Sequence, residues 1–217
     1  MRAATLTALF LSLASLPASA QELPEPLAGF PQVLVTTSHG EFVIELEGRR
    51  APVTAARFAE RVREGYYDGT IFHRVIKDFV IQGGGHKTDY SPTPDVPLMI
   101  NESGNGLSNE FGTVAMARDE PPHTATTQFY VNLKDNTALD PRSDRWGYTV
   151  FGRVTSGMET VEKIGNIPTG PGGPFAKEVP AVPAIVRSMR ILTDEEVAER
   201  VQAELDAARE ALEGATD

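Results

Sequence analysis

Residues 72–85, FHRVIKDFVIQGGG, decide the fold and raise the question of function. Two short runs rich in Phe, Val and Ile meet at residues 77–78, which indicates two β-strands joined by a tight turn. Alternation along a strand places Arg74 on the same face as Phe72 and Ile76. A guanidinium group is costly to bury among apolar side chains unless it is paired. Arg74 therefore needs either a hydrogen-bonding partner or a functional role that explains its position.

Gln82 is the partner that the pattern favours. It lies on the second strand, on the same face as Val80, so a hairpin brings it near Arg74. A neutral amide orients a guanidinium group without cancelling its charge. The alternative interpretation is an ordinary surface arginine that pairs with Asp78 or Asp89.

The rest of the body is rich in strands. Alternating or β-branched runs predict strands over residues 33–38, 41–46, 112–117, 128–133, 148–154 and 185–192. The two helices predicted in the body span 52–65, which starts at a proline and stops at a glycine, and 156–166, with a Ser156–Glu159 capping box. We predict loops over 86–110 and 168–184. The composition of elements indicates a mainly β protein whose antiparallel sheet is closed or nearly so, with the helices over its open ends.

One strand of this set carries polar and apolar residues in strict alternation. Gln128 and Tyr130 share one face, and Phe129 and Val131 share the other, which we assign to the core. Several strands thus present polar and apolar groups together. Such a surface suits a ligand that is apolar on one side and accepts hydrogen bonds on the other.

The N-terminal segment differs from the body. Residues 1–20 combine Arg2, an apolar run and a small-residue cleavage pattern, so we predict a signal peptide cleaved after Ala20. A membrane anchor is the competing interpretation, but the apolar run is short and contains Pro17. Residues 21–31 form a Pro-rich lead-in to a domain that spans 32–193. We therefore expect a periplasmic or secreted protein, without membrane insertion after cleavage and, having no cysteine, without disulfides or thiol chemistry.

The C-terminal segment, residues 194–217, is acidic. It holds nine Asp or Glu against two Arg, a large part of the net charge of −10. A capping box at Thr193–Glu196 and apolar residues at helical spacing predict a thin amphipathic helix. A solvated helix is favoured over a partner-binding one. Nothing in the charge distribution favours binding to nucleic acid. We expect the protein to be a monomer.

Several chemistries have little support. The four histidines, at 39, 73, 86 and 123, are too scattered to indicate a metal site. No G-x-S-x-G elbow accompanies a Ser-His-Asp set, and Gly83–Gly85 lacks the Lys-Ser or Lys-Thr of a phosphate loop. Glu102 and Glu110 are weak candidates for a hydrolytic carboxylate pair. We therefore predict neither metal nor cofactor.

Five motifs, in order, carry a resemblance. FHRVIKDFVIQGGG, GTVAMAR, QFYVNL, LD and YTVFGRV resemble the cyclophilin family of peptidyl-prolyl cis-trans isomerases over roughly residues 33–192, most of all its bacterial exported branch. The resemblance implies an eight-stranded antiparallel closed β-barrel capped by two α-helices, here with a C-terminal helical extension. It also implies rotation of X-Pro bonds in proline-containing polypeptides, without a cofactor.

The resemblance assigns roles by position. Arg74 resembles the catalytic arginine and Gln82 the glutamine that orients it. The walls of the proline pocket would be Phe79, Val80, Tyr130 and Leu139. The groove for the substrate backbone would be Ala117, Arg118 and Gln128, and Tyr148 stands where many members have histidine.

Some positions depart from the family pattern. Val80 replaces a common methionine, which would widen the pocket, and Arg118 replaces a common asparagine at a largely backbone contact. Ala138 stands where tight cyclosporin binders have tryptophan, so we expect weak cyclosporin binding, and we expect Trp146 to be structural. For His73 we favour packing on the barrel over a catalytic role.

Two functions remain open from the sequence. One is an isomerase that helps exported proteins fold, in which Arg74 supports the twisted imide. The other is a peptide-binding or chaperone module with incidental isomerase activity, in which the acidic tail recruits a partner. The joint presence of Arg74 and Gln82 favours the first. A hydrolase on the same scaffold has no supporting motif.

Overall fold

The computed structural model describes residues 24–25 and 27–214. The predicted signal peptide lies outside these residues. The main sheet has eight strands, and each pairs antiparallel with its neighbours. Their order across the sheet is β10 (Val186–Ile191), β1 (Gln32–Thr37), β2 (Gly40–Leu46), β7 (Val150–Ser156), β5 (Thr113–Met116), β6 (Phe129–Asn132), β4 (Val80–Gly83) and β3 (Arg74–Ile76). The mainly β, antiparallel prediction is confirmed.

The sheet is curled, but the predicted closure is not confirmed. Its two edge strands, β10 and β3, do not pair as strands. A single bridge between Ile71 and Ile185 joins the segments that precede them, and the amide of Phe72 donates to the carbonyl of Ala184 at 2.9 Å. β3 is only three residues long, so it offers little edge for further pairing.

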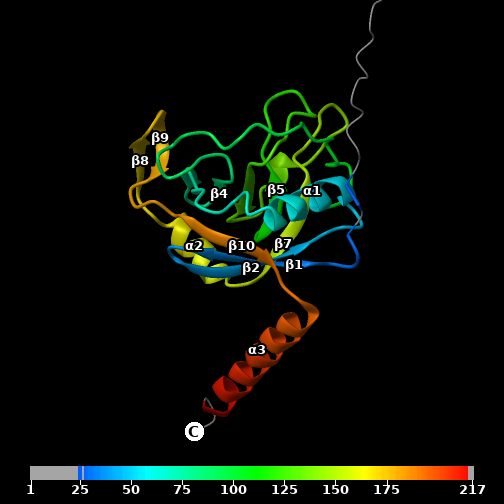
Figure 1. Ribbon diagram of the computed structural model, residues 1–217, viewed down its shortest axis with the longest axis vertical. Helices are drawn as coiled ribbons and strands as arrows, with labels where there is room; N and C mark the ends of the chain where they lie inside the picture. Colours follow the sequence, from blue (N-terminus) through cyan, green and yellow to red (C-terminus); the bar gives the residue numbers. More distant parts are fainter. Residues whose placement is uncertain (1–23, 26, 215–217) are drawn as a thin grey trace, which may run out of the picture.

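A second, two-stranded sheet covers that edge. β8 (Thr169–Gly172) and β9 (Phe175–Pro180) form a hairpin, and β9 contacts β3. Figure 1 shows the hairpin standing at the side of the sheet near β4. The sequence prediction of a loop over 168–184 is wrong here. The three prolines and three glycines in 168–174 hide the strand signal, since such residues are depleted in strands.

Two helices pack on the sheet, as predicted. α1 (Pro52–Arg63) contacts β10 and β7, and α2 (Met158–Gly165) contacts β2, β3 and β4. A short 3-10 helix spans Thr137–Leu139.

The N-terminus of α1 is capped from a distant loop. Ala51, at the N-cap position, has no side chain that could accept a hydrogen bond. The carboxylate of Glu102 accepts from the backbone amides of Val53 at 3.2 Å and Thr54 at 2.8 Å. It also accepts from the Thr54 hydroxyl at 2.7 Å. This carboxylate has a structural task, which removes the support for a hydrolytic pair with Glu110.

The predicted capping box of α2 is wrong. Gly157 is the N-cap residue, in a left-handed conformation with φ 78°, and no side chain caps the helix. A Cβ at Gly157 would collide with the backbone of Glu41 and Phe42. The Ser156 hydroxyl instead donates to Glu204 of the C-terminal helix at 2.6 Å.

The inner face of the sheet and α1 enclose the main core. Phe58 of α1 packs on Phe129 and Phe151 with ring centroids 5.4 and 5.0 Å apart. Phe129 and Val131 are fully buried there, as their alternation predicts. Burial of such side chains contributes roughly 1.5–3 kcal/mol each.

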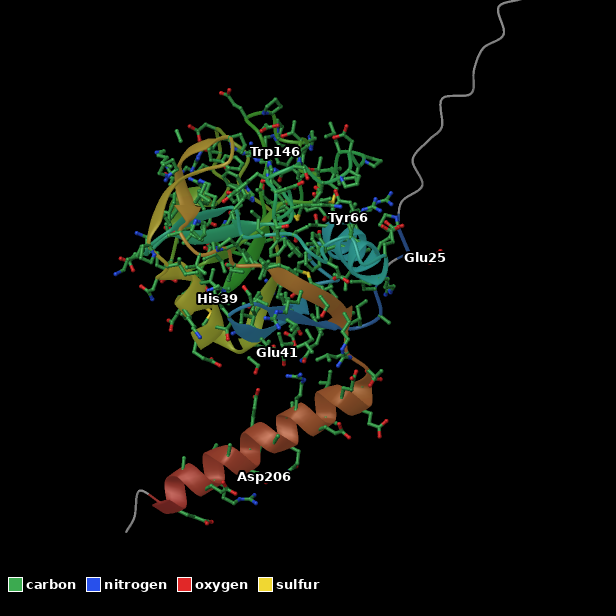
Figure 2. The ribbon with its side chains drawn as sticks, turned by 60° about the vertical axis from the view of Figure 1, so that its left-hand side comes forward. Glu25, His39, Glu41, Tyr66, Trp146 and Asp206 are labelled. Carbon is green, nitrogen blue, oxygen red and sulfur yellow. The ribbon has the colours of Figure 1, made fainter. Side chains whose placement is uncertain are left out.

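The tail forms helix α3 (Asp194–Gly214). The predicted Thr193–Glu196 capping box is confirmed by reciprocal hydrogen bonds of 2.9 and 3.2 Å. α3 extends away from the body, and Asp206 lies far along it (Figures 1 and 2). Val197 packs on Leu34, Val43 and Leu192. Within the described part of the chain, no helix is both long and apolar enough to cross a membrane.

Candidate functional site

Strand register brings the predicted site residues into one row. Arg74 of β3 pairs with Gln82 of β4, and Gln82 pairs with Tyr130 of β6. Tyr130 pairs with Ala115 of β5, which pairs with Val150 of β7. Register partners point to the same face of a sheet, so these five side chains line the face opposite the main core.

A hydrogen-bond relay orients the guanidinium group of Arg74. Its Nη1 donates to Oε1 of Gln82 at 3.2 Å. The Nε2 of Gln82 donates to Oε1 of Gln128 at 2.9 Å. Arg74 is half-buried, with 37% of its side chain exposed. The sequence thus correctly predicts that Gln82 lies beside Arg74, and the relay extends the set to Gln128.

Apolar side chains next to this relay form a cluster separate from the main core. Its buried members are Val80, Ala115, Tyr130 and Val150, and Phe79, Leu107, Ala117, Leu139 and Tyr148 pack on them half-buried. The six residues here that the sequence predicts as walls or groove come together. Sequence reasoning missed Ala115, Val150 and Leu107, although the first two follow from the register once the strands are paired.

Tyr130 is fixed by a buried polar network. Its hydroxyl donates to Oδ1 of Asn109 at 2.7 Å, and the carboxylate of Asp140 accepts from the Asn109 amide at 2.8 Å. Burial, followed by the nearby Tyr148 and Asp140, raises the pKa of Tyr130 well above its ordinary value. The hydroxyl therefore stays protonated and the ring is held rigidly in the cluster.

The side chain of Arg118 clamps two loops at the rim of the groove. Its Nε donates to the carbonyl of Gly147 at 3.1 Å and its Nη2 to that of Trp146 at 2.9 Å. Its Nη1 donates to the carbonyls of Asp119 and Glu120. The guanidinium group also lies over the ring of Tyr148, 4.7 Å from its centroid. These contacts occupy each nitrogen of the Arg118 guanidinium group.

A small depression adjoins the relay. Its volume is about 110 Å³, and it is lined by Gln82, Ala117, Arg118, Asp119, Thr124, Thr126 and Gln128. Three predicted groove residues and the orienting glutamine therefore share one concave surface.

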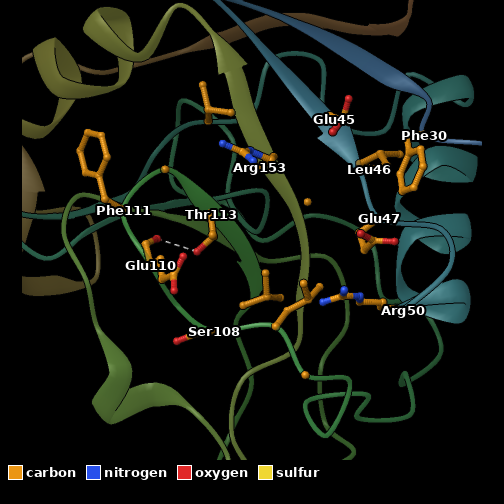
Figure 3. Close-up of a pocket in the computed structure, with 16 residues that line it drawn as sticks. Phe30, Glu45, Leu46, Glu47, Arg50, Ser108, Glu110, Phe111, Thr113 and Arg153 are labelled. Carbon is orange, nitrogen blue, oxygen red and sulfur yellow. Dashed lines mark hydrogen bonds between the residues drawn. The ribbon is translucent and has the colours of Figure 1, made fainter.

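A larger cavity of about 340 Å³ lies over β2, β5 and β7, and Leu107 and Val150 of the apolar cluster are among its lining residues. Figure 3 shows Phe30, Arg50, Phe111 and Arg153 around it, with Thr113 donating to the carbonyl of Glu110 at 2.7 Å. None of the predicted site residues lines it. The relay and the apolar cluster, not this cavity, carry the chemistry that the sequence indicates.

The acidic partner of Arg74 was not predicted. Its Nε donates to Oε2 of Glu178 in β9 at 2.7 Å. Within the described residues Arg74 has no ion pair with Asp78 or Asp89. Glu178 could not be found from the sequence, because it is 104 residues away in a segment predicted as loop.

His73 points away from Arg74 and is buried, as predicted. Its ring lies 4.5 Å from that of His86 and 5.4 Å from that of Phe175, centroid to centroid. Burial, with further contributions from His86 and Arg74, lowers the pKa of His73 to about 4. Burial also lowers the pKa of His86, so both imidazole rings are neutral at pH 7. Among residues 24–25 and 27–214, no group of three or more metal-ligating side chains occurs.

An arginine oriented beside an apolar cluster, on the outer face of a curled antiparallel sheet, defines a class of protein. Such a surface suits a partly apolar ligand that also accepts hydrogen bonds. Comparison with known proteins identifies the class further. The family model described as "Cyclophilin type peptidyl-prolyl cis-trans isomerase/CLD" matches residues 32–191.

Relatives agree with this match. The chain is 47% identical over 163 residues to peptidyl-prolyl cis-trans isomerase cyp18 of Streptomyces antibioticus, covering 74% of this chain and 98% of that protein. It is 42% identical to peptidyl-prolyl cis-trans isomerase B of Escherichia coli K12, covering 71% and 96%. A crystal structure of a cyclophilin-type isomerase from Cryptosporidium parvum superposes with a TM-score of 0.64 at 25% identity, covering 76% and 99%. The chain belongs to the cyclophilin-type peptidyl-prolyl cis-trans isomerase family.

Proposed function

We propose that this isomerase accelerates X-Pro rotation by using Arg74 to support the twisted imide. The observation that carries the proposal is the guanidinium group held by Gln82 at 3.2 Å, next to the apolar cluster. The amide of Gln82 fixes its direction and leaves its charge in place. The cluster supplies the wall against which a proline ring packs.

The chemistry needs no covalent step. The peptide C–N bond has partial double-bond character, so cis-trans exchange must cross about 18–20 kcal/mol. In the twisted state resonance is lost and the proline nitrogen gains a lone pair. A positively charged donor aimed at this nitrogen, or at the neighbouring carbonyl, stabilises the twisted state more than either planar state. Apolar surroundings exclude water and strengthen the interaction.

The substrates that fit are proline-containing polypeptides. A solved relative from Cryptosporidium parvum was crystallised in the presence of the dipeptide Ala-Pro. We assign the pocket walls to Phe79, Val80, Tyr130 and Leu139, and the backbone groove to Ala117, Gln128 and the main chain at Arg118. Tyr148 contributes its ring at the rim.

The decisive experiment measures cis-trans exchange of a short X-Pro peptide by NMR exchange spectroscopy. We expect Arg74→Ala to lower the catalysed rate by about 100-fold, the scale on which one preorganised donor contributes. Arg153→Ala, which removes an exposed arginine of β7 far from the relay, is the matched control and should leave the rate unchanged. Full activity in Arg74→Ala would refute the proposed role.

We also propose that the enzyme acts on exported proteins, in the periplasm or after secretion, as a monomer. The support is the N-terminal pattern ending at Ala20. Expression in a bacterial host, followed by fractionation and N-terminal sequencing, should find a mature protein beginning at Gln21 outside the cytoplasm. An uncleaved cytoplasmic chain would contradict this. Light scattering should give the mass of one chain.

Weak cyclosporin binding forms part of the same proposal. Ala138 lies exposed in the 3-10 helix, where it offers no aromatic surface to a cyclic ligand, and its carbonyl accepts from Arg145. Calorimetric titration of Ala138→Trp should give tighter binding than wild type. Equal affinity would contradict the assignment.

A second function, peptide binding with partner recruitment by α3, is favoured by one observation. Val201 and Leu205 lie 49% and 56% exposed on an acidic helix. Deleting residues 194–217 separates the two functions. If the truncated protein keeps both its exchange rates and its client binding, the isomerase function alone is supported. If it keeps its exchange rates but loses client binding, recruitment by α3 is supported.

A further inference from the structure

An ion pair joins Glu178 to Arg74 at this site. A carboxylate from β9 reaches the Nε of Arg74 at 2.7 Å, and only 22% of its side chain is exposed. The contact spans 104 residues of sequence. It joins the β8–β9 hairpin to the residue on which isomerisation depends.

The backbone of Glu178 is held in a conformation that non-glycine residues rarely adopt. Its φ is 68°, whereas its neighbour in the hairpin, Val179, pairs with Gly170. A left-handed non-glycine residue is disfavoured and persists only where its surroundings impose it. Here the turn of the chain brings the side chain toward Arg74.

The hairpin that carries Glu178 packs on two histidine rings of the main body. Phe175 packs on the rings of His73 and His86, at 5.4 and 5.0 Å between centroids. His73 directly precedes Arg74 in the chain, so this packing holds the hairpin next to the backbone of Arg74. Lys177, with 80% of its side chain exposed, binds the second oxygen of Glu178 at 3.0 Å.

Two contacts on different nitrogens fix the plane of a guanidinium group. Gln82 accepts from Nη1, and Glu178 accepts from Nε. Within the described part of the chain, no hydrogen bond from Nη2 occurs. The third nitrogen is therefore left for a peptide. With Gln82 alone, only Nη1 would be held, and the plane of the group could still tilt about that contact.

We propose that Glu178 is a positioning residue for isomerisation. It acts through Arg74 and does not touch the peptide. Burial tends to raise the pKa of Glu178, but hydrogen bonds from Lys177 and Arg74 outweigh it and hold the pKa below the ordinary value. The carboxylate is thus ionised at neutral pH and pairs as an anion. This inference rests on the proposed role of Arg74.

The test uses two substitutions at Glu178, one that relieves the backbone strain and one that keeps it. Glu178→Gly removes the carboxylate and suits a φ of 68°, so the fold should be as stable as wild type or more stable. Glu178→Gln keeps an acceptor but removes the charge. Lys177→Gln, on the same hairpin, is the matched control because it leaves the Glu178–Arg74 pair intact.

The experiment determines kcat and KM of cis-trans exchange by NMR, together with the ¹Hε–¹⁵Nε resonance of Arg74. Misplaced catalytic groups cost large factors in rate, so Glu178→Gly should lower kcat about tenfold, and Glu178→Gln about threefold, with KM within about twofold. The Arg74 resonance should move in both variants. Lys177→Gln should match wild type in every reading.

Two results would overturn the inference. Wild-type kcat in Glu178→Gly would make the pair a surface contact, and a raised kcat would make it a restraint on Arg74. Arg74→Ala measured in parallel separates this from the wider proposal. If Arg74→Ala retains activity, the role of Arg74 itself fails, whereas loss there with full activity in the Glu178 variants removes only the positioning role.

Discussion

Arg74 and Gln82 are register partners in adjacent strands, and Nη1 of the arginine donates to Oε1 of the glutamine at 3.2 Å. Because the pairing is set by the backbone ladder, the orientation of the guanidinium group is tied to the register of the β3–β4 hairpin. A slip of one residue would send both side chains to the other face. The register of the hairpin and the placement of the guanidinium group are therefore linked.

Gln82→Ala should weaken isomerisation without unfolding the protein. A hydrogen bond to a charged group contributes about 1.5–3 kcal/mol, which corresponds to a loss of roughly tenfold to 100-fold in kcat/KM if the orientation is felt in the transition state. Exchange NMR at fixed peptide concentration measures the change. Gln202→Ala, on exposed α3, is the control. Equal rates in the two variants would show that Arg74 needs no orienting amide.

Tyr130→Phe should destabilise the protein by about 1–2 kcal/mol, because Asn109 loses a buried donor. Urea unfolding monitored by fluorescence provides the measurement. Tyr148→Phe is the matched control, since within the described residues the Tyr148 hydroxyl has no hydrogen bond. A stability loss equal in both variants would mean that the Asn109 contact contributes nothing specific.

Glu102→Ala should lower the free energy of unfolding by about 1–2 kcal/mol, because it removes the cap of α1 and a carboxylate at the positive end of the helix dipole. Isomerase activity at a temperature where the variant stays folded should not change. Glu110→Ala, an exposed residue of the same polar loop, should stay within about 0.5 kcal/mol of wild type. Thermal unfolding of the three proteins decides the matter, and a destabilised Glu110→Ala would point to the loop rather than the cap.

Acid should destabilise the fold through His73. Its pKa is about 4 in the folded protein against an ordinary value of 6.5, so the unfolded chain binds more protons between these values. His73 therefore causes no loss of stability above pH 6.5. As the pH drops toward 4, the free energy of unfolding falls by up to about 3 kcal/mol. The groups around His73 are His86, Arg74 and the ring of Phe175.

Urea unfolding of wild type and His73→Gln across this pH range isolates the contribution of His73. The stability difference between the two proteins should shift in favour of the variant as the pH falls. His39→Gln, at the partly exposed β1–β2 turn, is the control and should show a smaller shift. A difference that stays constant with pH would rule out His73 as the titrating group.

Much of this site follows from local pattern. Alternation in 74–76, 80–82 and 128–131 predicts which residues face the core and which face outward, because a strand has a period of two. The prediction that Phe72 shares the face of Arg74 is wrong, because Phe72 precedes β3 and packs in the main core. The pairing of Arg74 with Gln82 follows from one hairpin. The family resemblance supplies the roles, and the structure brings the residues together in one row.

Other parts could not be predicted, and the reasons are physical. The β8–β9 hairpin is rich in glycine and proline, and its main-chain pairing leaves little trace in side-chain pattern. The cap of α1 comes from Glu102, 48 residues beyond Thr54. The start of α2 depends on backbone crowding at Gly157, which no propensity of Ser156 reveals. The contact of Glu178 with Arg74 depends on a tertiary arrangement of this kind.

The strands under the site are two-sided. Ile81, Val114 and Phe129 face the main core, while their neighbours Val80, Ala115 and Tyr130 face the groove. One side of each strand thus belongs to the main core, and the other belongs to the smaller apolar cluster. If the proposed pocket is right, we expect variation at half-buried positions such as Leu139 to change ligand selectivity while the main core stays constant. A library confined to the half-buried outward positions would vary recognition and leave the buried residues of both faces unchanged.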